Sequence, residues 1–189
     1  ATYALTGTPT NSEVGSHTVV ITATDTNSAS TAQTFTVVVT NTNDAPVVTS
    51  TAVTAVDEDA AYSYTVTATD VDVGDTLTMT GTTVPSWLTF DATTGILAGT
   101  PLNANVGANS VVITINDGTV DVTDTFTITV ANTNDAPTFT STAVTAVDED
   151  AAYSYTAAAS DDDGDAVTLA GTTIPAWMTF DEGTTGVDL

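Results

Sequence analysis

The sequence predicts an all-β chain built from antiparallel β-sandwich domains, on three observations. Apolar and polar residues alternate over short stretches such as 62–68 and 125–130, which is the period of a half-buried strand. Thr and Val are abundant, and turn signals such as Asp117-Gly118 separate the stretches. No stretch shows a helical period, and several short strands within about 90 residues are typical of a two-sheet sandwich.

The sequence also repeats itself, with a period of 91 residues between position 41 and position 132. The segment NTNDAP at 41–46 returns at 132–137, and the stretch 50–64 returns letter for letter at 141–155. Self-similarity at one fixed period indicates a tandem array. We therefore expect three parts: the C-terminal half of one repeat (1–46), a complete repeat (47–137) and the N-terminal half of a following repeat (138–189).

Two arrangements are compatible with this phase of the repeats. The chain is either a window on a longer protein, or residues 1–46 of one copy complete residues 138–189 of another. The second arrangement would give a head-to-tail homopolymer, because a contact between two different surfaces propagates without closing.

The charge is extreme, with 24 acidic residues, no Lys or Arg, and a formal net charge of −24. Nothing in the chain can neutralise a phosphate backbone or an anionic membrane surface, so nucleic acid is excluded as a partner. No run of about twenty apolar residues exists, so we expect no membrane insertion by this segment. The carboxylates need water, salt or bound metal to screen them, which indicates an extracellular or cell-surface location.

Many acidic residues gather in short segments that recur at matched positions of the repeats. The triplet at 57–59 returns at 148–150, and the Asp-rich segment at 70–75, which contains a Gly, returns at 161–165. Alternating acidic residues around a turn let several oxygens converge on one hard cation, and a cation that takes six to eight oxygen ligands is Ca²⁺. Zinc, copper and iron are poor candidates because the chain has no Cys and one His.

Three motifs resemble those of a known family. The NTNDAP segments resemble the Asp-x-Asn-Asp-x-Ala-Pro linker of cadherins, and the segment 68–72 resembles their Asp-x-Asp calcium loop. The stretch 85–95, followed by Gly-Thr-Pro at 99–101, resembles the bacterial dystroglycan-type cadherin-like domain and its Putative Ig relatives found in surface adhesins. The resemblance covers essentially the whole chain. It implies Ig-like, cadherin-like sandwich domains joined by short calcium-binding linkers.

The resemblance also implies which residues bind calcium at each junction. At the junction around Asn132 they are Asp57, Glu58 or Asp59, the linker residues Asn132, Asn134 and Asp135, and Asp161 and Asp163. At the earlier junction they are Asn41, Asn43, Asp44, Asp70, Asp72 and Asp117. In a polymer, Asp148, Glu149 and Asp150 of another copy would complete the earlier junction. Asn41 and Asn132 stand where cadherins place Asp, which implies fewer or weaker ions than three.

Two functions follow as alternatives, and neither is enzymatic. The chain lacks a Cys or Lys nucleophile, a recurring Ser–His pair and a Gly-rich phosphate loop, so we expect no enzyme. The first function is a calcium-rigidified structural or adhesive repeat of an extracellular surface protein or filament, whose partners are neighbouring repeats or copies of itself. The alternative is a carbohydrate-binding module attached to a polysaccharide-active enzyme, with a surface glycan as partner. Trp87 and Trp177 are expected to be core anchors rather than sugar-stacking platforms.

Overall fold

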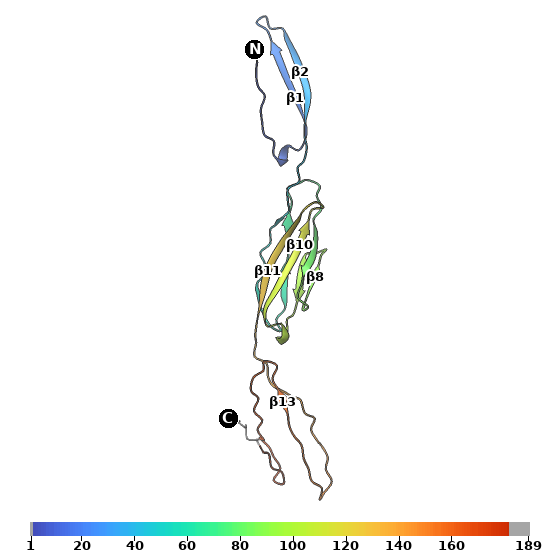
Figure 1. The fold of residues 1–189 in the computed structure, drawn as a ribbon, viewed down its shortest axis with the longest axis vertical. Helices are drawn as coiled ribbons and strands as arrows, with labels where there is room; N and C mark the ends of the chain where they lie inside the picture. Colours follow the sequence, from blue (N-terminus) through green and yellow to red (C-terminus); the bar gives the residue numbers. More distant parts are fainter. Residues whose placement is uncertain (1, 182–189) are drawn as a thin grey trace.

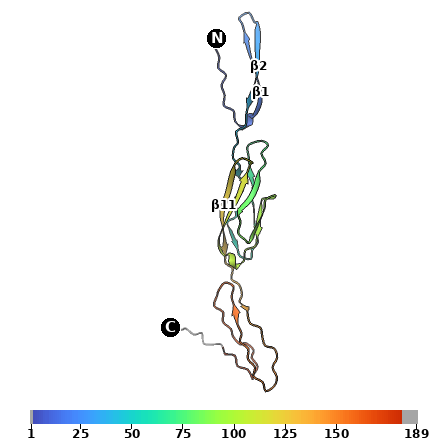
Figure 2. The same cartoon turned by 45° about the vertical axis from the view of Figure 1, so that its right-hand side comes forward.

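The computed structural model describes residues 2–181 and shows three parts arranged along one long axis (Figures 1 and 2). All regular elements are strands apart from two short 3₁₀ helices, η1 (Asn11–Glu13) and η2 (Asn103–Asn105). No helix in the described range is long and apolar enough to cross a membrane. The predicted all-β, Ig-like fold class is confirmed.

The middle part is a β-sandwich. Its larger sheet has the order β4-β11-β10-β7, formed by β4 (Ala55–Asp57), β11 (Asp121–Ala131), β10 (Gly107–Asn116) and β7 (Thr78–Thr83). Its smaller sheet has the order β5-β9-β8, formed by β5 (Tyr62–Thr65), β9 (Ile96–Gly99) and β8 (Leu88–Asp91). A short pair joins β3 (Val47–Val48) to β6 (Ala68–Thr69). All these pairings are antiparallel except β11 with β4.

The core of the middle part follows the alternation seen in the sequence. Tyr62, Tyr64 and Val66 are buried while the residues between them are exposed. Trp87 packs against the same core, donates from Nε1 to Asn109 Oδ1 at 3.0 Å, and meets the ring of Tyr62 edge to face. The core therefore depends on side chains from β10 as well as from β5.

The first part consists of η1 and a hairpin of β1 (Gly15–Thr24) with β2 (Ser30–Val39). This hairpin has the register of the β10–β11 hairpin, since Gly15 pairs with Val39 as Gly107 pairs with Val130. Residues 35–39 alternate apolar and polar side chains and lie within β2. Its apolar face is largely exposed, because no second sheet lies against it among the described residues.

The last part corresponds to the front half of the middle part but carries far less regular structure. Its residues 138–181 pair only through β12 (Thr138–Phe139) and β13 (Ala159–Ser160). Tyr153 and Trp177 repeat the edge-to-face contact of Tyr62 and Trp87. Trp177 is nevertheless 65% exposed, so it is not a core anchor in this structure. Trp177 is exposed because the described residues of this part contain no strand pair that would cover it.

Replacing Ile113 with Ala should destabilise the middle part by about 2 to 5 kcal/mol, because its fully buried side chain would leave a cavity. Chemical denaturation followed by Trp fluorescence measures this change. The matched control is Ile21→Ala, since Ile21 takes the corresponding place in β1 and is 46% exposed. An equal loss of middle-part stability in both variants would contradict this account of the core.

Alkaline pH should also destabilise the middle part. Burial raises the pKa of Tyr62 from 10.0 to about 12, with smaller contributions from Tyr64 and Asp124. Below pH 10 both states keep the proton, whereas between about pH 10 and 12 the unfolded state releases it first, so stability falls. The urea midpoint should drop between pH 9 and pH 11, and the drop should be smaller in Tyr62→Phe. If the urea midpoint of Tyr62→Phe fell by the same amount, the loss of stability would come from other titrating groups than Tyr62.

Candidate metal sites at the domain junctions

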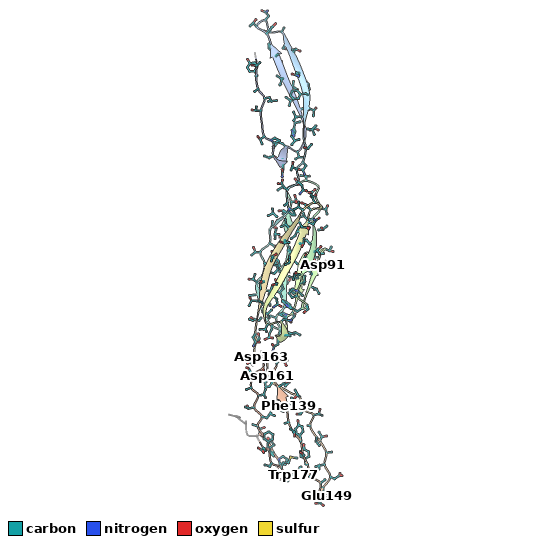
Figure 3. All side chains as sticks on the ribbon, viewed as in Figure 1. Asp91, Phe139, Glu149, Asp161, Asp163 and Trp177 are labelled. Carbon is teal, nitrogen blue, oxygen red and sulfur yellow. The ribbon has the colours of Figure 1, made fainter. Side chains whose placement is uncertain are left out.

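The two NTNDAP linkers, 41–46 and 132–137, each connect two parts of the chain, and acidic loops converge on both. We refer to the junction at 41–46 as the upper junction and to that at 132–137 as the lower junction. Figure 3 shows Asp161 and Asp163 at the lower junction, where the last part meets the middle part.

At the lower junction, carboxylates from both sides of the linker come together. Oxygens of Glu58, Asp135 and Asp163 lie within 4.8 Å of one another. Glu58 follows β4, and its N–H donates to Ala131 O at the end of β11, which brings the acidic triplet beside the linker. This sequence-predicted set therefore joins the middle part, the linker and the last part in one cluster.

Backbone hydrogen bonds hold this cluster in place. The N–H of Thr133 donates to Glu58 Oε1 at 2.6 Å, and the N–H of Asp135 donates to Asp163 Oδ2 at 2.6 Å. Each carboxylate thus accepts a backbone hydrogen bond with one oxygen, and the second oxygen of Glu58 has no hydrogen-bond partner.

A second group at the same junction belongs to the last part alone. Oxygens of Asp161, Asp163 and Asp165 lie within 4.8 Å of one another, so Asp163 is common to both groups. The N–H of Asp163 donates to Asp161 Oδ1 at 3.0 Å, and this hydrogen bond within the loop holds the two residues together. The sequence analysis quoted the segment 161–165 but did not assign Asp165 as a ligand.

The upper junction has an equivalent group in the middle part. Oxygens of Asp70, Asp75 and Asp117 lie within 4.8 Å of one another. The N–H of Asp44 donates to Asp72 Oδ2 at 2.7 Å, as Asp135 does to Asp163 below. Asp75, like Asp165, is a member that the sequence analysis quoted within a motif but did not predict as a ligand.

Three carboxylate oxygens at these junctions are buried and have no hydrogen-bond partner: Glu58 Oε2, Asp70 Oδ2 and Asp72 Oδ1. Glu58 is 2% exposed and Asp72 is 5% exposed. A buried carboxylate without a partner is costly, and the chain contains no Lys or Arg that could compensate it. Oxygen-only donor sets of this kind fit a hard divalent cation such as Ca²⁺.

Loss of hydration and crowded negative charges raise the pKa of one carboxyl group at each junction. Loss of hydration raises the pKa of the Asp75 carboxyl, and the charges of Asp72, Asp70 and Asp117 raise it further. At the lower junction the pKa of Asp135 is raised in the same way, first by loss of hydration. The neighbours whose charges add to that rise are Asp59, Asp163, Glu58 and Asp162.

Asp117 behaves in the opposite way. Asn43 Nδ2 donates to Asp117 Oδ2 at 3.0 Å, and this bond, followed by that from the Val120 N–H, lowers the pKa of the Asp117 carboxyl. Asp117 is 7% exposed, so these hydrogen bonds, rather than water, stabilise its charged form. This residue was among the predicted ligands.

Some of the remaining predicted residues lie at the junctions, and the triplet 148–150 does not. Asn41, Asn132, Asp57 and Asp59 are exposed at their edges, and Asn134 Nδ2 donates to Asp135 O at 2.8 Å. The second triplet lies at the far end of the last part, where Figure 3 places Glu149. The structure therefore brings Asp148, Glu149 and Asp150 to neither junction. Their ligand roles stay predictions, as do the domain bounds 1–46, 47–137 and 138–189.

Two Asn residues on the 3₁₀ helices were missed by the sequence analysis. Asn103 of η2 donates from Nδ2 to Asp162 O and approaches Asp163 Oδ1 at 3.5 Å. Asn11 of η1 donates to Asp44 Oδ2 at 2.7 Å. The available signal was their matched place in the repeats, two residues after Pro9 and Pro101. The Asn103 contacts give the lower junction a second connection besides the linker, whereas the Asn11 contact joins the first part to the upper linker itself.

Comparison with known proteins identifies the repeats. The family model of the Putative Ig domain (He_PIG) matches residues 1–40, 45–131 and 136–187. No curated protein matches the chain.

Among solved structures, the extracellular cadherin domains 1–4 of protocadherin gamma B7 are similar, with a TM-score of 0.53 and 22% identity. That match covers 80% of this chain and 42% of the protocadherin chain, and it supports an Ig-like, cadherin-like sandwich fold. The endo-fucoidan hydrolase MfFcnA4 from glycoside hydrolase family 107 matches with a TM-score of 0.41 and 28% identity. That match covers 67% of this chain but spans only 20% of the hydrolase chain.

In calcium-free buffer, Asp72→Asn should stabilise the chain by about 1 to 2 kcal/mol, because it removes one of several crowded charges and puts an amide donor in place of a buried unpaired oxygen. An Asn side chain can still accept the Asp44 N–H through its oxygen. Urea denaturation in chelator measures the effect. Asp91→Asn, in the middle part and away from both junctions (Figure 3), is the control and should change stability little. Destabilisation by Asp72→Asn under these conditions would show that the carboxylates do not repel one another.

Proposed function

Because this chain belongs to the Putative Ig domain family, we propose that it is a calcium-rigidified structural or adhesive repeat of an extracellular surface protein. The observation that carries the proposal is the set of three buried, unpartnered carboxylate oxygens at the two junctions, in a chain without a basic side chain. Such oxygens are costly to bury, and a cation beside them would offset that cost.

The lower junction indicates what calcium would do. Glu58 belongs to the middle part, Asp135 to the linker and Asp163 to the last part, so one ion would be held from both sides of the joint. When bound, Ca²⁺ supplies a compact positive charge that accepts these oxygens as ligands. Bending the joint would separate the ligands and cost binding free energy, so calcium would favour one straight arrangement.

The rest of the proposed function follows from the charge and from the repetition. Calcium at the concentrations that such sites need, together with salt that screens 24 acidic residues, supports an extracellular location. The acidic groups recur at both junctions, which supports a structural duty rather than catalysis. Nucleic acid is not a partner of so acidic a chain.

The carbohydrate-binding alternative draws less support from this structure. Of the two Trp residues that could stack on a sugar, Trp87 packs on the core and donates its indole N–H to Asn109, whereas Trp177 is 65% exposed. A glycan array in the presence of calcium tests the alternative directly, and specific binding would favour it over the structural role.

The experiment that tests the proposal measures the melting temperature and the maximum particle dimension of the full chain, with calcium and with chelator. Calorimetry should show a stabilisation of about 2.7 kcal/mol once free calcium is ~100-fold above its Kd. X-ray scattering should show a longer particle with a narrower distribution of shapes.

Glu58→Gln should reduce the calcium-induced rise in melting temperature, and Asp91→Asn, away from the junctions, should leave it intact. If chelator changes neither the melting temperature nor the particle length of the parent chain, the proposal fails and the acidic loops are simply solvated.

A further inference from the structure

We propose that Asn103 is a positioning residue of the lower junction. Its side-chain amide holds the loop 161–165 against the middle part even without a cation. It thereby keeps the carboxylate cluster of Glu58, Asp135 and Asp163 assembled before a cation binds. The benefit to cation binding rests on the proposed function. The restraint on the cation-free joint does not, because it depends only on contacts between protein groups.

Asn103 contacts the loop of the last part at two points. Its Nδ2 donates to the backbone oxygen of Asp162 and lies 3.5 Å from Asp163 Oδ1. The other oxygen of Asp163, Oδ2, accepts the N–H of Asp135 from the linker at 2.6 Å. One oxygen of the Asp163 carboxylate therefore faces η2 and the other faces the linker, which restrains both the position and the rotation of this group.

The loop passes this restraint on to its carboxylates because its own residues are bonded to one another. Asp161 Oδ1 accepts the N–H of Asp163 at 3.0 Å, and Asp161 O accepts the N–H of Gly164 at 3.2 Å. A hydrogen bond to the backbone of Asp162 therefore restrains the whole turn, and with it the carboxylates that belong to the cluster.

On the other side of the contact, η2 is anchored in the middle part. Pro101, just before η2, is buried, and its carbonyl accepts the N–H of Asp59 at 2.8 Å. At the end of η2, Asn105 O accepts a hydrogen bond from Asn109 Nδ2 at 2.8 Å. The Oδ1 of Asn109 in turn accepts the indole N–H of Trp87, which packs on the core. The first residue of η2 is therefore held on a fixed base.

The same construction occurs at the upper junction with different residues. Asn11 takes the place of Asn103 and donates to Asp44 Oδ2 in the upper linker at 2.7 Å. In both 3₁₀ turns the side chain of the third residue, Glu13 or Asn105, accepts the N–H of the residue before the turn. An amide donor that binds the linker or the loop beyond it is thus a recurring feature of the repeats.

The Asn103 contact and the linker both border a hollow of about 550 Å³. Its lining comes from η2, the linker, the loop and the acidic triplet: Asp59, Leu102, Asn103, Ala104, Asp135 and Asp162. A linker by itself leaves the following part free to bend and turn about it. A second connection beside the hollow opposes both motions, so a cation has fewer arrangements of the joint to select from.

The size of the effect follows from the loss of one hydrogen bond, which changes an equilibrium constant by about fivefold. The cation-free joint should therefore populate the closed arrangement about fivefold more with the Asn103 contact than without it. Calcium affinity at the lower junction should fall by about the same factor when the contact is removed, because the cation then binds a less populated arrangement.

Double electron–electron resonance on the full chain in chelator tests the restraint. The chain has no Cys, so nitroxide labels on Thr125→Cys in β11 and Thr145→Cys in the last part, both exposed positions, report on the lower joint. Asn103→Ala should broaden the distribution of label distances. Asn103→Asp should broaden it at least as much, because it keeps the shape of the side chain but replaces the donor with a negative charge. An unchanged width in both variants would overturn the inference.

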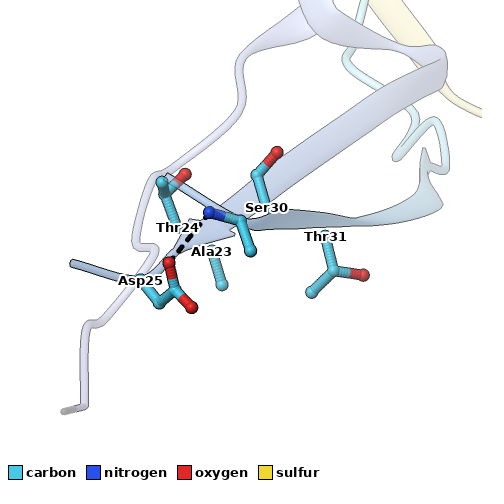
Figure 4. Close-up of a pocket in the computed structure, with 6 residues that line it drawn as sticks. Ala23, Thr24, Asp25, Ser30 and Thr31 are labelled. Carbon is cyan, nitrogen blue, oxygen red and sulfur yellow. Dashed lines mark hydrogen bonds between the residues drawn. The ribbon is translucent and has the colours of Figure 1, made fainter. Parts of the chain in front are cut away.

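Asn27→Ala is the matched control, since it makes the same change of side chain in the turn between β1 and β2. In that turn Asp25 Oδ1 accepts the backbone N–H of Ala29 at 2.8 Å (Figure 4) and that of Asn27 at 2.9 Å, and both bonds survive the substitution. The control should keep the parent distribution. The urea midpoint of the middle part should be the same in Asn103→Ala as in the control, and equal broadening in the two variants would overturn the inference.

A calcium titration followed with the same labels separates this inference from the proposed function. The calcium concentration that narrows the distribution halfway should be about fivefold higher in Asn103→Ala than in Asn27→Ala, and saturating calcium should restore the parent width. Equal concentrations in the two variants would overturn the pre-assembly of the cluster. If calcium does not narrow the parent distribution, the proposed function fails together with the pre-assembly, whereas the restraint is decided by the measurement in chelator.

Discussion

The arrangement at the junctions depends on how this chain deals with negative charge that it cannot neutralise by itself. Every ion pair with Lys or Arg is excluded by composition, so buried carboxylates such as Glu58 and Asp72 have only backbone N–H groups, amide side chains and an external cation as partners. The backbone groups satisfy one oxygen of each and leave the other without a partner. The geometry of the junctions therefore suits the proposed cation, and without a cation the carboxylates would repel one another.

The sequence was sufficient to predict the fold class and the location of the junctions, because both depend on local signals. Alternation at 62–68 predicted which side chains enter the core, and the repeated NTNDAP segments predicted where domains meet. Asp75 and Asp165 were missed as ligands, since their proximity to Asp70 or Asp161 depends on how the Gly turns the loop. Asn103 was missed although it stands two residues after Pro101, as Asn11 stands after Pro9, because its contact with the last part is made across the junction.

The two halves of a repeat show how much of a strand's environment comes from outside it. Ile113 and Ile21 occupy the same place in two hairpins of the same register, yet one is fully buried and the other is 46% exposed. Nothing in the local sequence separates them. Burial is conferred by the opposing sheet, as the contrast between Trp87 and Trp177 also shows from the other half.

The proposed metal binding would therefore be coupled to the packing of the two sheets in this architecture. The residues that close a carboxylate cluster, Glu58 and Asp117, sit at the ends of strands whose middles form the core. Packing of those strands brings their terminal carboxylates to the junction, and a cation bound there would in turn hold the strand ends in place. By thermodynamic linkage the two effects are equal in size, so a gain in calcium affinity on docking must appear as an equal gain in docking affinity on calcium binding.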